Sequence, residues 1–272
     1  MGDGADLSAI IEAFALGFRR LLALWTSWST SSLSSSYARR TDHIMMNYYE
    51  ITGPDSEKLQ ADFNKCFGKR ESIPCNVEPR HDGGHRRIGP LHLEVKHNRR
   101  DEQMIWSWGM EFAVHERILD GFEKAGFTGY RTNPATVRFG DGHIANDYHE
   151  FVVTGWAGIV SPDSGVRLMK TCPGCHLTEY SAITNYEQVI DWNQWTGEDF
   201  FLIWPMMGYR LITDRVAEWL QVHKVKSFRL ERGLDARKRD SIISKLSISV
   251  GRLSLYLPED LAIKYGRPLG LE

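Results

Sequence analysis

Two stretches of this 272-residue chain resemble each other closely enough to constrain its fold. One begins at Glu111 and reads "EFAVHERILDGFEKAGFTGYR", and the other begins at Tyr209 and reads "YRLITDRVAEWLQVHKVKSFR". Each copy has an apolar run, an amphipathic pattern of about three helical turns and a second apolar run. This order predicts a strand, a helix and a strand, twice, and therefore an α+β fold with a mixed or antiparallel sheet.

The two predicted helices differ in how they begin. Thr213 with Asp214 is a favourable start, since Thr is a preferred N-cap and an acidic residue suits the first turn. His115 holds the same place in the first copy and is expected to be a poorer cap. Internal duplication and the ordinary likeness of any two strand-helix-strand units both explain the similarity.

Composition shifts divide the chain into three predicted segments. An amphipathic helix and a serine-rich linker come first, an α+β core follows, and a C-terminal extension ends the chain. The linker and helix are either a docking or membrane-surface element or an extension that the fold does not need. The segments are 1–44, 45–233 with the two related units at 106–139 and 204–232, and 234–272.

Charge and cysteine content narrow the class of protein. A formal net charge of -2 argues against a dedicated nucleic-acid-binding domain, which would be strongly basic. No apolar run reaches the roughly 20 residues that span a bilayer, because Glu12, Arg19 and Arg20 interrupt the longest one. Four cysteines, two of them in a C-x-x-C, fit a reducing compartment, so we expect a cytoplasmic protein.

A C-x-x-C turn, Cys172-Pro-Gly-Cys175, lies between the two units. Two cysteines at this spacing can hold half of a zinc site, and the other ligands must then come from elsewhere in the chain. An inert turn and a redox pair are the other interpretations, although "HLTEYSAITNY" lacks the helical stripe that follows a redox cysteine. The candidate partners for zinc are Cys66, Cys75, His81 and His85.

Two further stretches are candidates for function. "RFGDGHIANDYHE" could supply an acid and a base or hold a cation, although a loop of turn-forming residues explains the same letters. It contains Asp141, His143, Asp147, His149 and Glu150. The stretch from Arg80 to Arg100 could contact phosphate, or it could be an exposed basic hairpin. Its basic residues are Arg80, Arg86, Arg87, Lys96, Arg99 and Arg100.

Several stretches together resemble a known bacterial family, the double-CXXCG-motif proteins of myxobacterial type. They are "VVTGWAGIVSPDSGV", "CPGCHLTEYS", "IDWNQWTGEDFFLIWPMMGYRLITDRVAEWL" and "VKSFRL", within about Trp106 to Arg229. The family is named for two C-x-x-C-G motifs, whereas this chain has one, with His176 where the glycine would stand. The resemblance implies a protein-binding role, since some members are similar to immunity proteins that neutralise a toxin.

We therefore expect a non-catalytic protein that binds another protein, with a bacterial toxin as the partner that the resemblance implies. Zinc at Cys172 and Cys175 is the candidate cofactor, and nucleic acid is not an expected partner. One alternative is a zinc-ribbon-like regulator that contacts nucleic acid through Arg80 to Arg100. Another is a hydrolase that uses His143, Asp147 and His149.

Overall fold

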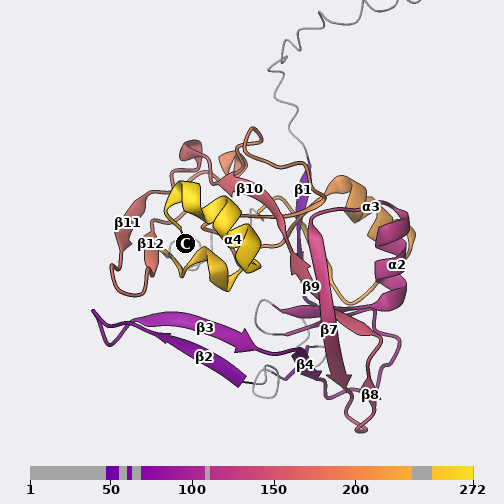
Figure 1. Ribbon diagram of the computed structural model, residues 1–272. Coiled ribbons are helices and arrows are strands. Elements are labelled where there is room, and N and C mark those ends of the chain that lie inside the picture. Colours follow the sequence, from indigo (N-terminus) through magenta and orange to yellow (C-terminus); the bar gives the residue numbers. More distant parts are fainter. Residues whose placement is uncertain (1–46, 55–59, 63–68, 108–110, 235–246, 272) are drawn as a thin grey trace, which may run out of the picture. The chain divides into compact units, whose positions relative to one another are not determined.

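The computed structural model describes residues 47–54, 60–62, 69–107, 111–234 and 247–271 (Figure 1). The helix and linker expected within 1–44, and Cys66, lie outside these residues. The described chain contains both strands and helices and is dominated by strands, so the prediction of an α+β fold is confirmed at this level.

The elements follow one another along the chain in this order. The strands are β1 (Tyr48–Thr52), β2 (Lys69–Pro74), β3 (Asp82–Ile88), β4 (Leu91–Glu94), β5 (Met104–Trp106), β6 (Phe112–His115), β7 (Tyr130–Arg138), β8 (Ile144–Ala145), β9 (Tyr148–Val153), β10 (Gly155–Ile159), β11 (Leu168–Thr171), β12 (Thr178–Tyr180), β13 (Phe200–Trp204), β14 (Leu211–Thr213), β15 (Arg229–Arg232) and β16 (Ile248–Val250). The helices are α2 (Glu116–Lys124), α3 (Asp214–Val222) and α4 (Glu259–Gly266), with short 3-10 turns η2 (Pro162–Ser164), η3 (Tyr186–Gln188), η6 (Leu253–Leu255) and η7 (Arg267–Leu269).

The two largest sheets share a local arrangement. In one, with the order β4-β7-β9-β6-β5, α2 connects β6 to β7 and β9 lies antiparallel between them. In the other, with the order β10-β13-β14-β1-β15, α3 connects β14 to β15 and β1 lies antiparallel between them. The inserted strand follows its unit in the first sheet and precedes it in the second. A common origin of the two units stays a prediction.

Two smaller sheets lie beside these. β11, β12 and β16 form a three-stranded antiparallel sheet, and β2 pairs with β3 as an antiparallel hairpin. Figure 1 shows that hairpin, in purple, running below β11 and β12 and toward β4. These two small sheets position the candidate functional site.

The helix starts reverse the expectation from sequence. His115 caps α2 well, because its Nδ1 atom accepts a hydrogen bond from the Arg117 N–H at 3.2 Å. Thr213 makes no side-chain cap on α3, and its hydroxyl donates instead to the buried Asp199 at 3.1 Å. The Thr213 hydroxyl bonds to the carboxylate rather than to the helix end, because a buried carboxylate without hydrogen-bond donors costs more free energy than an uncapped helix end.

One hydrophobic core receives residues from both large sheets and from α2 and α3. Val250, Leu253, Leu257 and Ala262 of the C-terminal segment belong to the same core, and Trp156 stacks on Tyr265 with ring centroids 5.4 Å apart. Residues 247–271 are thus packed against the sheets. No helix in the described ranges combines the length and the apolar character needed to cross a membrane.

Phe122 on α2 is the centre of an aromatic cluster in this core. It is fully buried, and five aromatic rings lie with centroids 5.1 to 6.1 Å from its own, those of Phe127, Tyr130, Phe151, Phe200 and Trp219. Edge-to-face contacts of this kind add to the free energy gained by burial.

We expect Phe122→Ala to lower the free energy of unfolding by about 3–5 kcal/mol, because it leaves a large cavity among these rings. Val222→Ala, at a side chain that is 75% exposed on α3, is the matched control and should change it by less than about 0.5 kcal/mol. Urea unfolding followed by tryptophan fluorescence measures both. Equal stabilities of the two variants would contradict this account of the core.

Candidate metal centre

Two β-hairpin tips that are distant in sequence meet in space. The loop from Cys75 to His81 joins β2 to β3, and the loop from Cys172 to Leu177 joins β11 to β12. Although Cys75 and Cys172 are 97 residues apart, their sulfur atoms lie 3.5 Å from each other. The candidate ligand atoms of Cys75, His81, Cys172 and Cys175 all lie within 4.8 Å of one another.

The distances suit a tetrahedral metal ion. Besides the Cys75–Cys172 contact, the Cys175 sulfur lies 3.9 Å from Nδ1 of His81. Four ligands placed at about 2.3 Å from a central zinc ion are separated by about 3.8 Å from one another. Cys172 and Cys175 are 2% and 1% exposed, so the set is closed from solvent on the side of the C-x-x-C turn.

Backbone groups of the C-x-x-C turn stabilise a thiolate. The N–H groups of Cys175 and Gly174 donate to the Cys172 sulfur and lower the pKa of that thiol to about 6. Burial acts in the other direction on Cys175 and raises the pKa of its thiol. The first hairpin has a similar contact, since the Glu78 N–H lies 3.3 Å from the Cys75 sulfur. A metal ion needs deprotonated thiols, and this environment already favours one of them.

The path of the second loop brings it back onto its own hairpin. His176 has a φ of 61°, in the left-handed region, and its N–H donates to the Cys172 carbonyl at 3.0 Å. The Cys172 N–H in turn donates to the Leu177 carbonyl at 2.9 Å. The residue directly after the second cysteine thus adopts the backbone conformation for which glycine is best suited.

Two glycines allow the hairpins to approach. A Cβ atom at Gly83 on β3 would lie 2.4 Å from the Ile73 carbonyl oxygen and 3.0 Å from the Cys175 Cβ. A Cβ atom at Gly174 would lie 3.1 Å from the Cys75 sulfur. Side chains at these positions would force the two loops apart, so the sequence is adapted to the close contact between them.

The structure selects among the ligands suggested by sequence. It brings Cys172 and Cys175 together with Cys75 and His81. His85 is exposed on β3 and is not a member of the cluster. A turn and then β12, rather than a helix, follow Cys175, so the helix dipole of a thioredoxin-like redox pair is missing there.

The sequence named Cys75 and His81 as candidates together with Cys66 and His85 but did not choose among the four, because Cys66 and Cys75 lack the spacing of a common knuckle. The available signal was the pairing of strands on both sides. "KRESIP" before Cys75 and "DGGHRRI" after His81 form the two arms of one hairpin, so both ligands lie in its connecting loop. Ligand spacing alone could not show this.

The acidic side chains of the stretch considered for a hydrolase pair with separate basic residues. Asp141 pairs with Arg100 at 2.6 Å, Asp147 pairs with His115 at 3.2 Å, and Glu150 pairs with Arg87. Among the described residues, the only group of three or more histidine, cysteine or acidic side chains able to share a metal ion is the cysteine–histidine cluster. The three carboxylates around 141–150 thus take part in separate ion pairs, and a hydrolase that uses this stretch stays a prediction.

The basic stretch from Arg80 to Arg100 is neutralised by carboxylates. All six of its arginine and lysine side chains lie within ion-pair distance of an acidic side chain. The pairs are Arg80–Glu78, Arg86–Glu71, Arg87–Glu150, Lys96–Asp62, Arg99–Glu102 and Arg100–Asp141. Phosphate would have to displace a carboxylate at each position, which disfavours nucleic acid as the ligand.

Comparison with known proteins does not assign this chain to a family. No family model matches this chain, and no curated protein is significantly similar to it.

We expect the purified protein to bind a short DNA duplex weakly at low salt and not measurably at physiological salt, because the basic side chains between Arg80 and Arg100 are already paired. Glu71→Gln and Glu78→Gln free Arg86 and Arg80, so the double variant should bind better. Its salt dependence should steepen by about one released counterion for each freed arginine. Fluorescence anisotropy measures both, and tight, salt-sensitive binding by the wild type would contradict the prediction.

Proposed function

We propose that this chain is a zinc-stabilised, non-catalytic protein that acts by binding another protein. The observation that carries the proposal is the set of Cys75, His81, Cys172 and Cys175, three sulfurs and one nitrogen, at the tips of two hairpins. Structural zinc sites have four protein ligands, whereas catalytic sites keep one position open for water or substrate. Three thiolates also select zinc over magnesium or calcium, which prefer oxygen.

The zinc ion stabilises the β2–β3 hairpin, which has no hydrophobic core of its own. Within the described residues, β2 and β3 pair only with each other, and most side chains of this hairpin are at least partly exposed. A two-stranded hairpin is marginally stable in water without further support. A metal ion that bridges its loop to the β11–β12 loop therefore supplies free energy that packing does not.

The surface beside the cluster supports a protein partner. β11 is an edge strand of its three-stranded sheet, and its residues Leu168 and Met169 are 61% and 64% exposed. An exposed apolar edge strand is a template for pairing with a strand from another chain. Such pairing gives affinity through the backbone and specificity through alternate side chains.

The resemblance to double-CXXCG-motif proteins supports the same class of function. In this proposal the chain is a divergent member in which the loop from Cys75 to His81 replaces the first C-x-x-C-G motif. Its partner is a bacterial toxin that it neutralises by covering a functional surface. The reducing cytoplasm, where thiols stay free to bind zinc, is the proposed location.

Zinc content is the first test. We expect about one zinc ion per chain by mass spectrometry on protein purified without a metal-affinity tag, since four ligands hold one ion. Cys175→Ser and His81→Ala remove a ligand each and should lose most of the zinc. Trypsin should then cleave faster within the β2–β3 hairpin, because its loop is no longer held.

His85→Ala is the matched control for the zinc experiment, because it removes a histidine of the same hairpin that is not part of the cluster. It should keep its zinc and its resistance to trypsin. A wild-type protein that contains no zinc, or a His85→Ala variant that loses as much zinc as His81→Ala, would contradict the proposed site.

The partner is tested with toxin-like proteins encoded beside this gene. We expect one of them to form a complex with the purified protein and to be neutralised by it when the two are co-expressed. Met169→Asp places a charge on β11 and should weaken that complex, whereas Ile144→Asp at the exposed strand β8 should not. Equal effects of the two substitutions would exclude β11 as the docking strand.

A further inference from the structure

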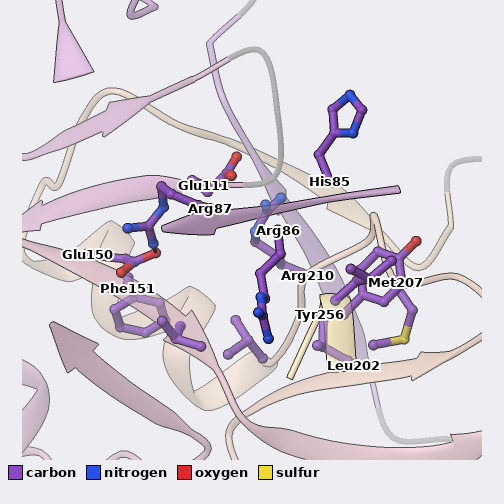
Figure 2. A pocket seen from close by; sticks show the side chains of 13 residues that line it. His85, Arg86, Arg87, Glu111, Glu150, Phe151, Leu202, Met207, Arg210 and Tyr256 are labelled. Carbon is purple, nitrogen blue, oxygen red and sulfur yellow. Dashed lines mark hydrogen bonds and ion pairs between the residues drawn. The ribbon is translucent and has the colours of Figure 1, made fainter. Parts of the chain in front are cut away.

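A cavity lies beside β3 of the β2–β3 hairpin, away from the loop that carries the metal cluster. It has a volume of about 230 Å³ and is bounded by β3, β9, the loop before β14 and the turn η6. Figure 2 shows Arg87 directed toward Glu150 on one side of it, Tyr256 and Met207 on the other, and His85 pointing away from both groups. The apolar lining includes Phe151, Val153, Leu202, Met207 and Tyr256.

Arg210 lines this cavity without a carboxylate partner. Its main-chain oxygen accepts from the Ile51 N–H at 2.9 Å, which fixes the backbone, and its guanidinium lies 5.3 Å from the centroid of the Phe112 ring. The Trp106 ring is stacked on Phe112 and lies 5.8 Å from the same guanidinium. Among the described residues, this guanidinium forms no hydrogen bond and no ion pair within 4 Å.

The other charges around the cavity are already compensated. Arg87 pairs with Glu150, which also accepts a hydrogen bond from Asn133 at 3.0 Å. Arg86 pairs with Glu71 at 2.9 Å across the hairpin. Glu111, the remaining acidic group of the lining, lies 3.5 Å from Arg70. Within the described part of the chain, Arg210 is therefore the arginine of this lining that has no carboxylate within ion-pair distance.

Burial disfavours the charged form of Arg210 and lowers its pKa to about 10, with the negative charges of Glu111 and Glu50 acting in the opposite direction. The side chain is still protonated at neutral pH. The side chain is half-buried, and the faces of two aromatic rings, rather than an acceptor, lie beside its guanidinium. An anionic group in the cavity would give it a charge-assisted hydrogen bond that no described residue supplies.

We propose that this cavity binds the carboxylate of a small monoanionic ligand with an apolar body, with Arg210 as the partner of the carboxylate. Arginine and carboxylate match in geometry and form paired charge-assisted hydrogen bonds. The apolar lining receives the rest of the ligand. Because the other charged groups of the lining are already paired, a single negative charge matches the one arginine that lacks a carboxylate partner.

The size of the cavity restricts the ligand further. Pockets for drug-sized molecules hold roughly 300–1,000 Å³, and this one is smaller. A short fatty acid or a single-ring aromatic acid is the class that fits. The residue proposed to bind the carboxylate is not part of the metal cluster, because Arg210 belongs to the loop before β14, although β3 of the hairpin forms one wall of the cavity.

The test uses hexanoate and benzoate as probes and their neutral amides as controls, on zinc-loaded full-length protein whose metal content is measured on the same sample. Ligand-observed NMR titration gives each Kd. The wild type should bind each acid at least about 10-fold more tightly than its amide, since a hydrogen bond to a charged group is at stake. Arg210→Gln should remove this preference, and Arg210→Lys should keep part of it.

Arg100→Gln is the matched control, because it removes the same charge from an exposed ion pair elsewhere on the protein and should leave the preference unchanged. Equal binding of acid and amide by the wild type, or no binding of either acid, would overturn the proposal. So would a preference that survives in a folded Arg210→Gln variant. If that variant does not fold, the comparison of acid with amide in the wild type and in Arg210→Lys still decides.

Discussion

The contact between two hairpin loops is the constraint on which the outer part of this structure depends. The β2–β3 hairpin has no third strand among the described residues, and most of its side chains are at least partly exposed. Its loop is nevertheless held within 3.5 Å, sulfur to sulfur, of a loop on a different sheet. Clustered thiols without a metal ion contribute little free energy to holding the loops together, whereas four ligands bound to one zinc ion contribute a large free energy.

The rest of the chain is stabilised in another way. Around Phe122 the two large sheets and their helices bury aromatic and aliphatic side chains in one core, and the C-terminal segment adds Leu253 and Leu257 to it. None of these core residues belongs to the metal cluster. Loss of zinc is therefore a local event in this scheme, in which the hairpin detaches while the core stays folded.

Sequence reasoning recovered the elements whose side-chain period is strong. Leu91 and Leu93 alternate with the polar residues His92 and Glu94, and in β4 both leucines are buried while His92 is exposed. Both helices of the similar stretches form where their apolar stripes predicted them, α2 burying Ile118 and Phe122. Local patterns of this kind are decided within a few residues, which is why a single sequence is enough to read them.

The candidate site was only half visible for a physical reason. Cys172 and Cys175 are a recognisable pair because their spacing is short, but their partners Cys75 and His81 are brought in by pairing of strands far away in the chain. A one-residue change of register reverses the face of every side chain in a strand, and sequence does not fix long-range register. The prediction that Thr213 caps α3 was wrong for the same reason. Its hydroxyl donates to Asp199, which is 14 residues away in the sequence.

The two proposed sites share the strand β3. His81, a member of the metal cluster, immediately precedes this strand, and Arg86 and Arg87 near its far end line the cavity that contains Arg210. A zinc ion that holds the hairpin in place thereby holds one wall of the cavity. If a carboxylate ligand binds only the protein whose hairpin is held in place, zinc raises the affinity for that ligand. The ligand must then raise the affinity for zinc by the same factor, because coupling between two binding sites is reciprocal.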